Sequence, residues 1–319
     1  MKRLILFAHY DKDNIVDDYV IRFLEGLAPY YDRLVFASDS DLNETEVAKI
    51  KQFGEVAHAT HHGEYDFGSW KRAFQYVGTD IEDYDEAIIV NDSCFGPLYD
   101  FSEMFDKMDQ SPCDFWGVTG TIIKRIDQYC INNYIMSFRK PIFASTKFHE
   151  FWQNITKLNN KFEIVGKYEF GLSDMLFEEG FKADVYAGWY DTDIMVTSEF
   201  FPKVWQKKRC PIVKVKVFRT NEDEMPHVGE WLKKLDGSYP RSLIDNLVQR
   251  YIGTTNPAHY HFKFPLFKRY WGHKNLLAVK ARYTKSKRWW RFHIKLFGIY
   301  IFMIWLPSKR PDASVDKLQ

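Results

Sequence analysis

Three clusters of polar side chains directly follow short apolar runs in the sequence. The clusters are His9-Tyr10-Asp11, His61-His62-Gly63 and Asn91-Asp92-Ser93. Runs such as Arg3–His9 and Glu86–Val90 predict buried strands, and helical stripes between such runs predict a parallel sheet with helices on both faces. Ligands in sheets of this kind bind beyond the carboxyl ends of the strands. We therefore expect the three clusters to lie close together and to form a binding site.

Asp92 is the side chain in these clusters best suited to bind a metal ion. It follows the apolar strand I-I-V, where a carboxylate can hold a divalent cation that neutralises a diphosphate. The competing interpretation is an Asx-turn or a helix cap at the end of a strand. A single aspartate by itself favours that structural interpretation.

Two further segments contain residues that could do chemistry. Asp66 caps a predicted helix, and Ser69 and Lys71 in its first turns could bind phosphate or sugar together with backbone N–H groups. The alternative is an ordinary capped helix with Trp70 in the core. Glu169 begins a second predicted helix, where it could take a proton from an acceptor hydroxyl. The commoner role for such a glutamate is to complement the helix macrodipole.

Several enzyme classes are disfavoured by what the sequence lacks. The four cysteines have no C-x-x-C spacing, so neither a zinc ribbon nor a redox pair is indicated, and scattered thiols fit a reducing compartment. The sequence contains no P-loop, dinucleotide-binding or nucleophile-elbow motif. Its start has no signal-peptide pattern, and no apolar run is long enough to cross a membrane. We therefore expect a cytoplasmic protein.

Charge is distributed unevenly along the chain and divides it into residues 1–245 and 246–319. The first part has 29 basic and 41 acidic residues, whereas residues 246–311 have 14 basic residues and no acidic residue. Aromatic side chains alternate with these basic residues, and an apolar run, Leu296–Leu306, follows. As a helix this run would measure roughly 16 Å, too short to span a bilayer. We expect a basic, partly helical segment that binds an anionic membrane surface. Nucleic acid is not expected as a partner, because the apolar run has no use there, although the run could instead be a core helix or a dimer contact.

Five motifs, taken in order, resemble one protein family. They are F-A-H-Y-D near the start, Y-D-F-G-S-W-K at 65–71, Y-D-E-A-I-I-V-N-D-S-C-F-G-P at 84–97, C-D-F-W-G-V-T at 113–119 and E-F-G-L-S at 169–173. Together they resemble the rhamnan synthesis protein F family of bacterial polysaccharide glycosyltransferases, over roughly residues 3–200. The resemblance implies an α/β, Rossmann-like nucleotide-diphospho-sugar transferase fold of the GT-A type with a mostly parallel sheet, and we expect this domain to occupy residues 1–245. It also implies dTDP-L-rhamnose as donor and a lipid-linked cell-surface glycan as acceptor. The basic segment would hold the protein at the inner face of the cell membrane.

The resemblance also implies roles for individual residues in an inverting transfer. Asp92 would bind Mg²⁺ or Mn²⁺ at the diphosphate, Lys71 would assist the leaving group, and either Glu169 or Asp114 would act as general base. The other residues expected to contact the donor are His9, Asp66, Ser69, Trp70, Asn91, Ser93 and Trp116, the two tryptophans by stacking. The sequence departs from the usual pattern in reading N-D-S instead of D-x-D, which puts metal dependence in question. It also has His61-His62-Gly63-Glu64 where an arginine- or asparagine-containing stretch is expected. Two alternatives stay open: another nucleotide-sugar donor on the same fold, and a non-catalytic scaffold in polysaccharide assembly.

Overall fold

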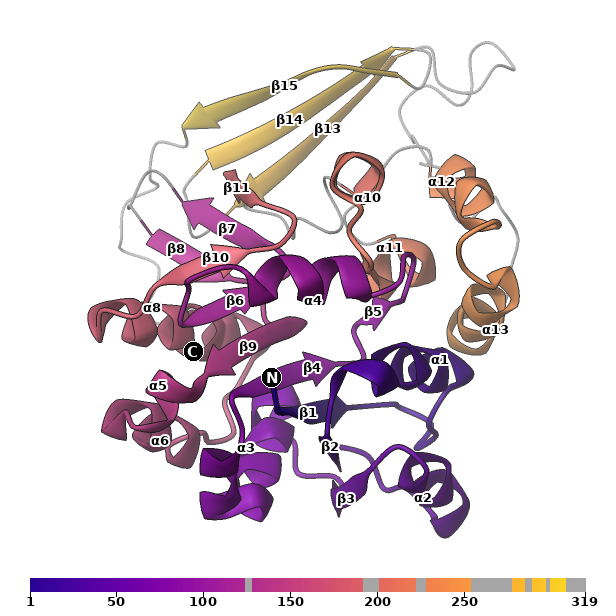
Figure 1. Ribbon diagram of the computed structural model, residues 1–319. Helices are drawn as coiled ribbons and strands as arrows, with labels where there is room; N and C mark the ends of the chain where they lie inside the picture. Colours follow the sequence, from indigo (N-terminus) through magenta and orange to yellow (C-terminus); the bar gives the residue numbers. More distant parts are fainter. Residues whose placement is uncertain are drawn as a thin grey trace, which may run out of the picture. The chain divides into compact units, whose positions relative to one another are not determined.

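The computed structural model describes residues 1–123, 128–191, 201–221, 228–253, 277–284, 289–296 and 299–307 (Figure 1). The chain divides into two compact units, Met1–His261 and Phe262–Gln319, which are described separately. The boundary expected at residue 245 falls inside helix α13 (Arg241–Ile252), which belongs wholly to the first unit.

A seven-stranded sheet forms the centre of the first unit, in the order β10-β6-β9-β4-β1-β2-β3. These strands are β10 (Ala183–Val185), β6 (Phe115–Gly117), β9 (Ile135–Arg139), β4 (Glu86–Asn91), β1 (Arg3–His9), β2 (Arg33–Ser38) and β3 (Glu55–Ala59). Strand β9 is antiparallel to both β4 and β6, and every other pair of neighbours is parallel. The predicted α/β class with a mostly parallel sheet is therefore confirmed, and the strands predicted at Arg3–His9 and Glu86–Val90 are β1 and β4.

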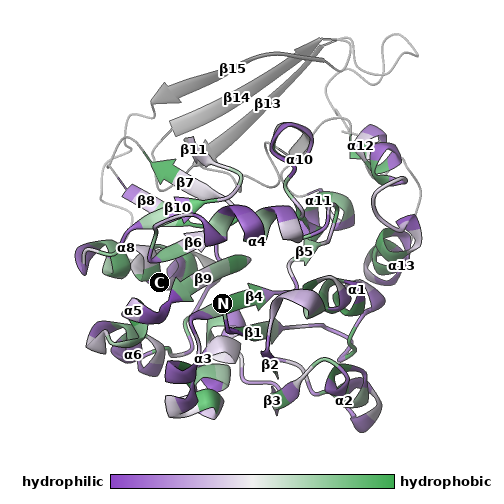
Figure 2. Ribbon diagram, in the orientation of Figure 1, coloured by the Kyte–Doolittle hydropathy of each residue, from purple (hydrophilic) through white to green (hydrophobic). Residues whose placement is uncertain are grey.

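Helices cover both faces of this sheet. They include α1 (Asp18–Leu27), α2 (Glu44–Lys51), α3 (Tyr65–Val77), α4 (Ser102–Asp109), α5 (Lys140–Phe143), α6 (Thr146–Gln153), α7 (Lys161–Ile164), α8 (Gly171–Glu178), α10 (Phe201–Lys208), α11 (Val215–Arg219) and α12 (Val228–Leu235). Alternate residues of β1 enter different clusters: Ile5 and Phe7 pack with α1, and Leu4 and Leu6 pack with α3. Both faces of the strand are thus buried, as its unbroken apolar run predicts, and Figure 2 shows the resulting apolar centre.

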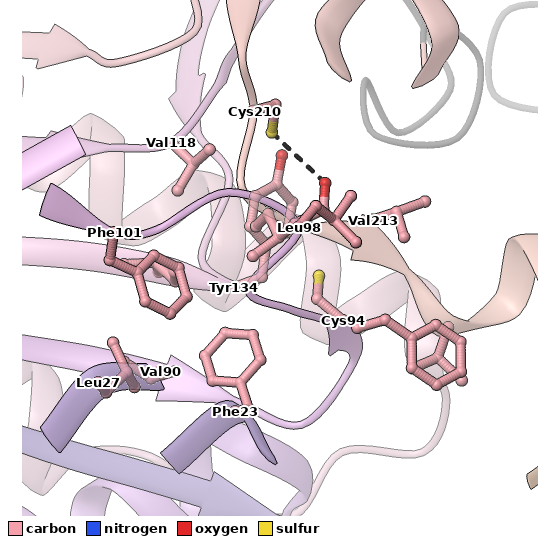
Figure 3. Packing of buried hydrophobic residues seen from close by; sticks show 14 of the residues in the cluster. Phe23, Leu27, Val90, Cys94, Leu98, Phe101, Val118, Tyr134, Cys210 and Val213 are labelled. Atoms are coloured by element: carbon pink, nitrogen blue, oxygen red, sulfur yellow. Dashed lines mark hydrogen bonds between the residues drawn. The ribbon is translucent and has the colours of Figure 1, made fainter. Parts of the chain in front are cut away.

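The first cluster also joins α1 to the segment that follows β4. Phe23 and Leu27 of α1 pack with Val90 and Phe101, and Cys94 and Tyr134 lie in the same cluster (Figure 3). The side chains of these residues are almost fully buried. This packing holds the carboxyl end of β4 against the helices that follow it in the chain.

Aspartate and serine side chains cap two of the helices. Ser145 caps α6, and its hydroxyl accepts the N–H of Phe148. Asp17 caps α1. The cap predicted at Asp66 differs from the structure. Asp66 lies inside the first turn of α3 and not at its cap, because the helix already begins at Tyr65.

Two small sheets extend the region beyond β4. One joins β7 (Gly120–Ile123), β8 (Gln128–Ile131) and β11 (Trp189–Asp191). The other pairs β5 (Cys94–Phe95) with β12 (Val213–Lys214) in antiparallel fashion. The second sheet is important for the site, because it places a late segment of the chain beside Asn91-Asp92-Ser93.

In the second unit the structure describes a three-stranded antiparallel sheet. Its strands are β13 (Leu277–Thr284), β14 (Trp289–Leu296) and β15 (Ile299–Pro307). The helix considered over Leu296–Leu306 is therefore wrong, because that run supplies the last residue of β14 and most of β15. The run is rich in isoleucine and aromatic residues, which favour strands, and a short apolar run does not distinguish strand from helix by periodicity alone. Within the described residues, no helix combines the length and the apolar character that crossing a membrane requires.

Candidate active site

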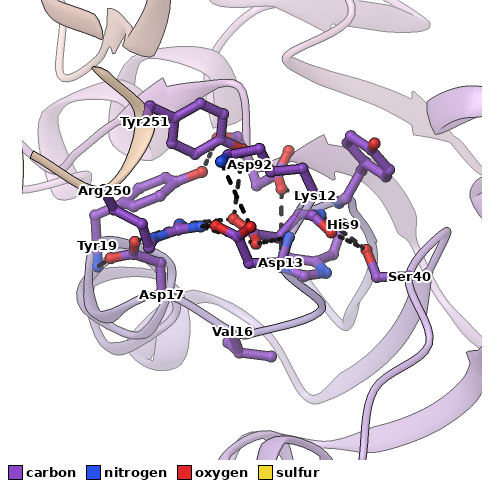
Figure 4. A network of polar contacts seen from close by, with 12 residues as sticks. His9, Lys12, Asp13, Val16, Asp17, Tyr19, Ser40, Asp92, Arg250 and Tyr251 are labelled. Carbon is purple, nitrogen blue, oxygen red and sulfur yellow. Dashed lines mark hydrogen bonds and ion pairs between the residues drawn. The ribbon is translucent and has the colours of Figure 1, made fainter. Parts of the chain in front are cut away.

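The polar clusters meet at one edge of the sheet. Strands β1, β2, β3 and β4 are parallel, so their carboxyl ends lie side by side. The backbone N–H of Tyr10 donates to Asp92 Oδ2 at 2.9 Å, which joins the end of β1 to the end of β4. The N–H of Asp11 donates to Ser40 Oγ at 2.8 Å, which joins β1 to β2 (Figure 4). The predicted meeting of these segments is confirmed.

Asp92 lies at the centre of this edge, with its side chain 11% exposed. Burial raises its pKa well above the usual value, and the nearby carboxylate of Asp66 raises it further, while the N–H of Tyr10 acts in the opposite direction. The hydroxyl of Tyr19 donates to the Asp92 carbonyl at 2.9 Å and fixes the backbone. A ligand that brings positive charge or a hydroxyl donor to Asp92 would be favoured here.

His9 is a buried neutral neighbour of Asp92. Its Nε2 lies 3.9 Å from Asp92 Oδ2, and its Nδ1 lies 2.8 Å from Ser38 Oγ. Burial lowers the pKa of His9 to about 4, so the ring is uncharged at neutral pH. His9 therefore gives the aspartate a polar neighbour and no compensating charge.

Asn91 and Ser93 connect Asp92 to the rest of the site. Asn91 Nδ2 donates to Asp66 Oδ2 at 2.8 Å, which brings the start of α3 to the end of β4. The hydroxyl of Ser93 donates to Asn91 Oδ1 and accepts a hydrogen bond from Lys214 Nζ at 2.7 Å. The structure thus brings Asp66, Asn91, Asp92 and Ser93 together, as the sequence predicted.

Asp39 is a part of this edge that the sequence reasoning missed. It follows β2, and its Oδ1 accepts the backbone N–H groups of His62 at 2.6 Å and Gly63 at 2.8 Å. His61 Nδ1 lies 3.0 Å from the same oxygen. The signal was present, because S-D-S follows an apolar strand just as the other three clusters do. Ser69 belongs to the same group: it is 1% exposed, and its Oγ lies 3.0 Å from His62 Nε2.

Arg250 of α13 is a second residue that sequence reasoning missed. Its guanidinium lies 2.6 Å from a carboxylate oxygen of Asp11, and 2.7 Å from those of Asp13 and Asp17 (Figure 4). The hydroxyl of Tyr251 lies 3.5 Å from Asp11. This cluster holds the loop between β1 and α1, whose Tyr10 N–H binds Asp92. Arg250 counts among the basic residues of the segment 246–311, and that charge pattern alone does not indicate this cluster.

Three residues that were expected to contact the donor instead make contacts within the fold. Trp70 is 1% exposed and donates to the Val90 carbonyl, and Trp116 is fully buried and donates to Glu86. Neither ring has a face accessible for stacking, so that expectation is corrected. Lys71 Nζ donates to the Ile155 carbonyl at 2.7 Å and ties α3 to the end of α6.

The two candidate bases lie in different places. Asp114 precedes β6, at the opposite edge of the sheet from Asp92, where its carbonyl accepts the N–H of Arg139 at 2.9 Å. Its carboxylate accepts the N–H of Lys182. Because Asp114 lies before β6 and Asp92 lies after β4, the length of a strand separates them, and Asp114 is not placed to act as a base beside Asp92. Glu169 lies in a π-helical turn, Val165–Phe170, immediately before α8 and beside Cys130 of β8.

The described residues do not form a metal site by themselves. Within them, no three histidine, cysteine, aspartate or glutamate side chains group closely enough to hold a metal ion. Asp66 and Asp11 are the carboxylates that act on Asp92, and they are bound to Asn91 and Arg250. Among the described residues, the donor set for a divalent cation is therefore incomplete.

The chain belongs to the rhamnan synthesis protein F family, because it matches the profile of that family over residues 34–282. A comparison with curated proteins found no match.

Among solved structures, the fold is similar to a glycosyltransferase involved in the glycosylation of the major capsid of PBCV-1. That structure is 12% identical with a TM-score of 0.38, over 74% of this chain and 100% of that one. A cytidylyltransferase from Leptospira borgpetersenii is 15% identical with a TM-score of 0.38, over 77% and 98%. Core-mannan synthase A from Aspergillus fumigatus, in its Mn/GDP form, is 6% identical with a TM-score of 0.31, over 48% and 63%. All three likenesses are distant in both sequence and shape.

Proposed function

We propose that this protein is a glycosyltransferase that moves a sugar from a nucleotide diphosphate to a lipid-linked cell-surface glycan, with dTDP-L-rhamnose as donor. The observation that carries the proposal is the meeting of Asp66, Asn91, Asp92 and Ser93 at the carboxyl edge of parallel strands, in a member of the rhamnan synthesis family. Ligands of α/β sheets bind at this edge. The antiparallel strand β9 beside β4 also fits the mixed sheet of a GT-A type transferase.

The reaction we propose is a single displacement at the anomeric carbon. The acceptor hydroxyl oxygen forms the new bond to this carbon while the bond from carbon to the diphosphate oxygen breaks, and the diphosphate leaves with the electron pair. The carboxylate of Glu169 takes the acceptor proton. Asp92 and Asn91 orient the donor, and His9 and Ser69 support the surrounding loops. A divalent cation would neutralise the diphosphate if one were bound with the donor.

A nucleotide panel tests this proposal. Ligands that bind only the folded state raise its stability, by about 2.7 kcal/mol at a hundred times Kd. We expect dTDP and dTDP-L-rhamnose to raise the melting temperature more than UDP-glucose, and incubation with an acceptor extract to release dTDP from dTDP-L-rhamnose. A larger shift with UDP-glucose would indicate another donor, and no shift with any nucleotide would favour the scaffold.

We also propose that the protein works at the inner face of the cell membrane, because its acceptor is lipid-linked and residues 246–311 carry 14 basic and no acidic residues. Basic residues near an anionic leaflet contribute about 1 kcal/mol each. The whole protein should float with anionic vesicles, release with added salt, and ignore zwitterionic vesicles. Equal flotation with both vesicle types would contradict the electrostatic part of this proposal.

A further inference from the structure

Lys214 is a buried lysine whose direct contacts are a hydroxyl and an aromatic ring. The residue is 6% exposed, its Nζ donates to Ser93 Oγ at 2.7 Å, and it lies 4.7 Å from the centre of the Tyr134 ring. Within the described part of the chain, no carboxylate lies at ion-pair distance from this ammonium. A buried charge is costly unless an opposite charge or several hydrogen bonds compensate for it. The position therefore favours an anionic ligand.

The backbone fixes this ammonium beside Asn91-Asp92-Ser93. Lys214 belongs to β12 and lies opposite Cys94 of β5 in an antiparallel pair. The N–H of Val215 donates to the Ser93 carbonyl at 2.9 Å. Lys214 is therefore a rigidly placed residue of the site and not a mobile surface lysine.

Asn133 supplies a second, independent observation at the same end of the sheet. It is 7% exposed, and within the described residues neither its Oδ1 nor its Nδ2 has a hydrogen-bond partner. It precedes Tyr134, whose ring lies under the ammonium and whose carbonyl accepts the N–H of Asn91 at 3.3 Å. Buried polar atoms without partners are rare in folded proteins and call for an explanation such as a bound water, ion or ligand.

The carboxylates explain why a cation is needed here. The carboxylates of Asp66 and Asp11 raise the pKa of Asp92 and the guanidinium of Arg219 lowers it, so a diphosphate entering this edge would meet more acidic than basic groups around Asp92. The described residues do not complete a metal site that could offset them. Lys71, the lysine assigned to this task from the sequence, is occupied by the Ile155 carbonyl.

On the basis of the proposed function, we propose that Lys214, with Ser93, binds the donor diphosphate directly and supplies the positive charge that the sequence assigned to a metal at Asp92. The ammonium would also stabilise the charge that develops on the leaving diphosphate, because a fixed cation in a buried site acts strongly on such charge.

Calorimetric titration of the whole protein tests this assignment, with dTDP and thymidine as probes, in EDTA and in Mg²⁺. We expect dTDP to bind in EDTA, and Lys214→Met to weaken dTDP binding by about tenfold or more while leaving thymidine binding unchanged. Ser93→Ala should weaken dTDP binding in the same direction but less. The unliganded Lys214→Met variant should melt at or above the wild-type temperature, because it removes an uncompensated buried charge.

Lys107→Met is the control for a lysine with similar contacts that is exposed. Lys107 also lies over a tyrosine ring, at 5.2 Å from that of Tyr186, and donates to a neutral oxygen, the Tyr186 carbonyl, at 2.6 Å. Tyr186 follows β10, at the far end of the sheet order from β3. This variant should bind dTDP as the wild type does.

Three outcomes would overturn the assignment. In the first outcome, dTDP binding requires Mg²⁺ and is unchanged in Lys214→Met. A metal ion would then neutralise the diphosphate in place of Lys214, and the proposed function would still hold. An equal loss of dTDP and thymidine binding in Lys214→Met, with a lower melting temperature, would make the lysine structural. Binding of neither probe under any condition would refute a dTDP-linked donor together with this assignment.

Discussion

A carboxylate lies at each end of strand β4, and the two differ in the charges and hydrogen-bond donors that surround them. At its start, Glu86 is fully buried and accepts hydrogen bonds from Arg3 Nε at 2.6 Å, Trp116 Nε1 at 2.7 Å and Ser137 Oγ at 2.7 Å. At its end, Asp92 has a carboxylate nearby, and the cation Lys214, which lies opposite Cys94 in the β5–β12 pair, contacts a hydroxyl and a ring.

The difference indicates that Glu86 serves the stability of the fold, whereas Asp92 is available to a ligand. Around Glu86 the chain provides its own compensating charge and hydrogen bonds, so the network stabilises the fold and offers nothing to a ligand. Around Asp92 the contacts described above leave charge less well compensated, at the edge where α/β sheets bind ligands. Perturbed and incompletely satisfied groups concentrate at functional sites, so this contrast supports the proposed site.

The largest expected effect separates the two candidate bases, Glu169 beside Cys130 of β8 and Asp114 before β6. Glu169→Gln keeps the side-chain shape but cannot accept a proton, so the transfer rate should fall by about 10²–10⁴-fold. Asp114→Asn, near the Glu86 end of the sheet, should stay within a few-fold of the wild type, roughly the scatter of surface substitutions. The measurement is the initial rate of sugar transfer at saturating donor. A severe loss in Asp114→Asn together with an active Glu169→Gln would reverse the assignment.

The next effect concerns stability at the compensated end. Glu86→Gln removes the buried negative charge that Arg3 binds. It also removes the negative charge that lies 3.9 Å from Arg139 Nε. The free energy of unfolding should fall by about 3 kcal/mol, as when one partner of a buried ion pair is removed. Urea unfolding measures this loss, and dTDP affinity of the folded protein should be unchanged. Unaltered stability would show that the network at Glu86 contributes little.

The smallest effect has the opposite sign and occurs at the other end of the same strand. Asp92→Asn removes the charge that burial and Asp66 disfavour, so stability should rise by on the order of 1 kcal/mol. Sugar transfer should nevertheless be lost. Thermal unfolding and the transfer assay, run on the same preparation, test both halves. A variant that is less stable than the wild type would indicate that Asp92 stabilises the fold, and the contrast between the two ends of β4 would fail.

The local parts of the fold were predictable because they depend on neighbouring residues. The apolar runs at Arg3–His9 and Glu86–Val90 form β1 and β4, and Ser145 caps α6 as its sequence indicates. The apolar run at Leu296–Leu306 was the exception. Its composition favours strands while its length also fits a short helix, and only pairing with β14 decided the outcome.

The sequence by itself determined the alternation of strands and helices, and it placed Asp92 at a strand end. Parallel strands then had to gather the polar clusters at one edge, because their carboxyl ends point the same way. Tertiary structure alone decided which residues join them. Lys214 reaches Ser93 across 121 positions and Arg250 reaches Asp11 across 239, and no local pattern reports such contacts. The same long-range packing buried Trp70 and Trp116 and placed Asp114 at the opposite edge, because burial depends on what the whole chain brings to a surface.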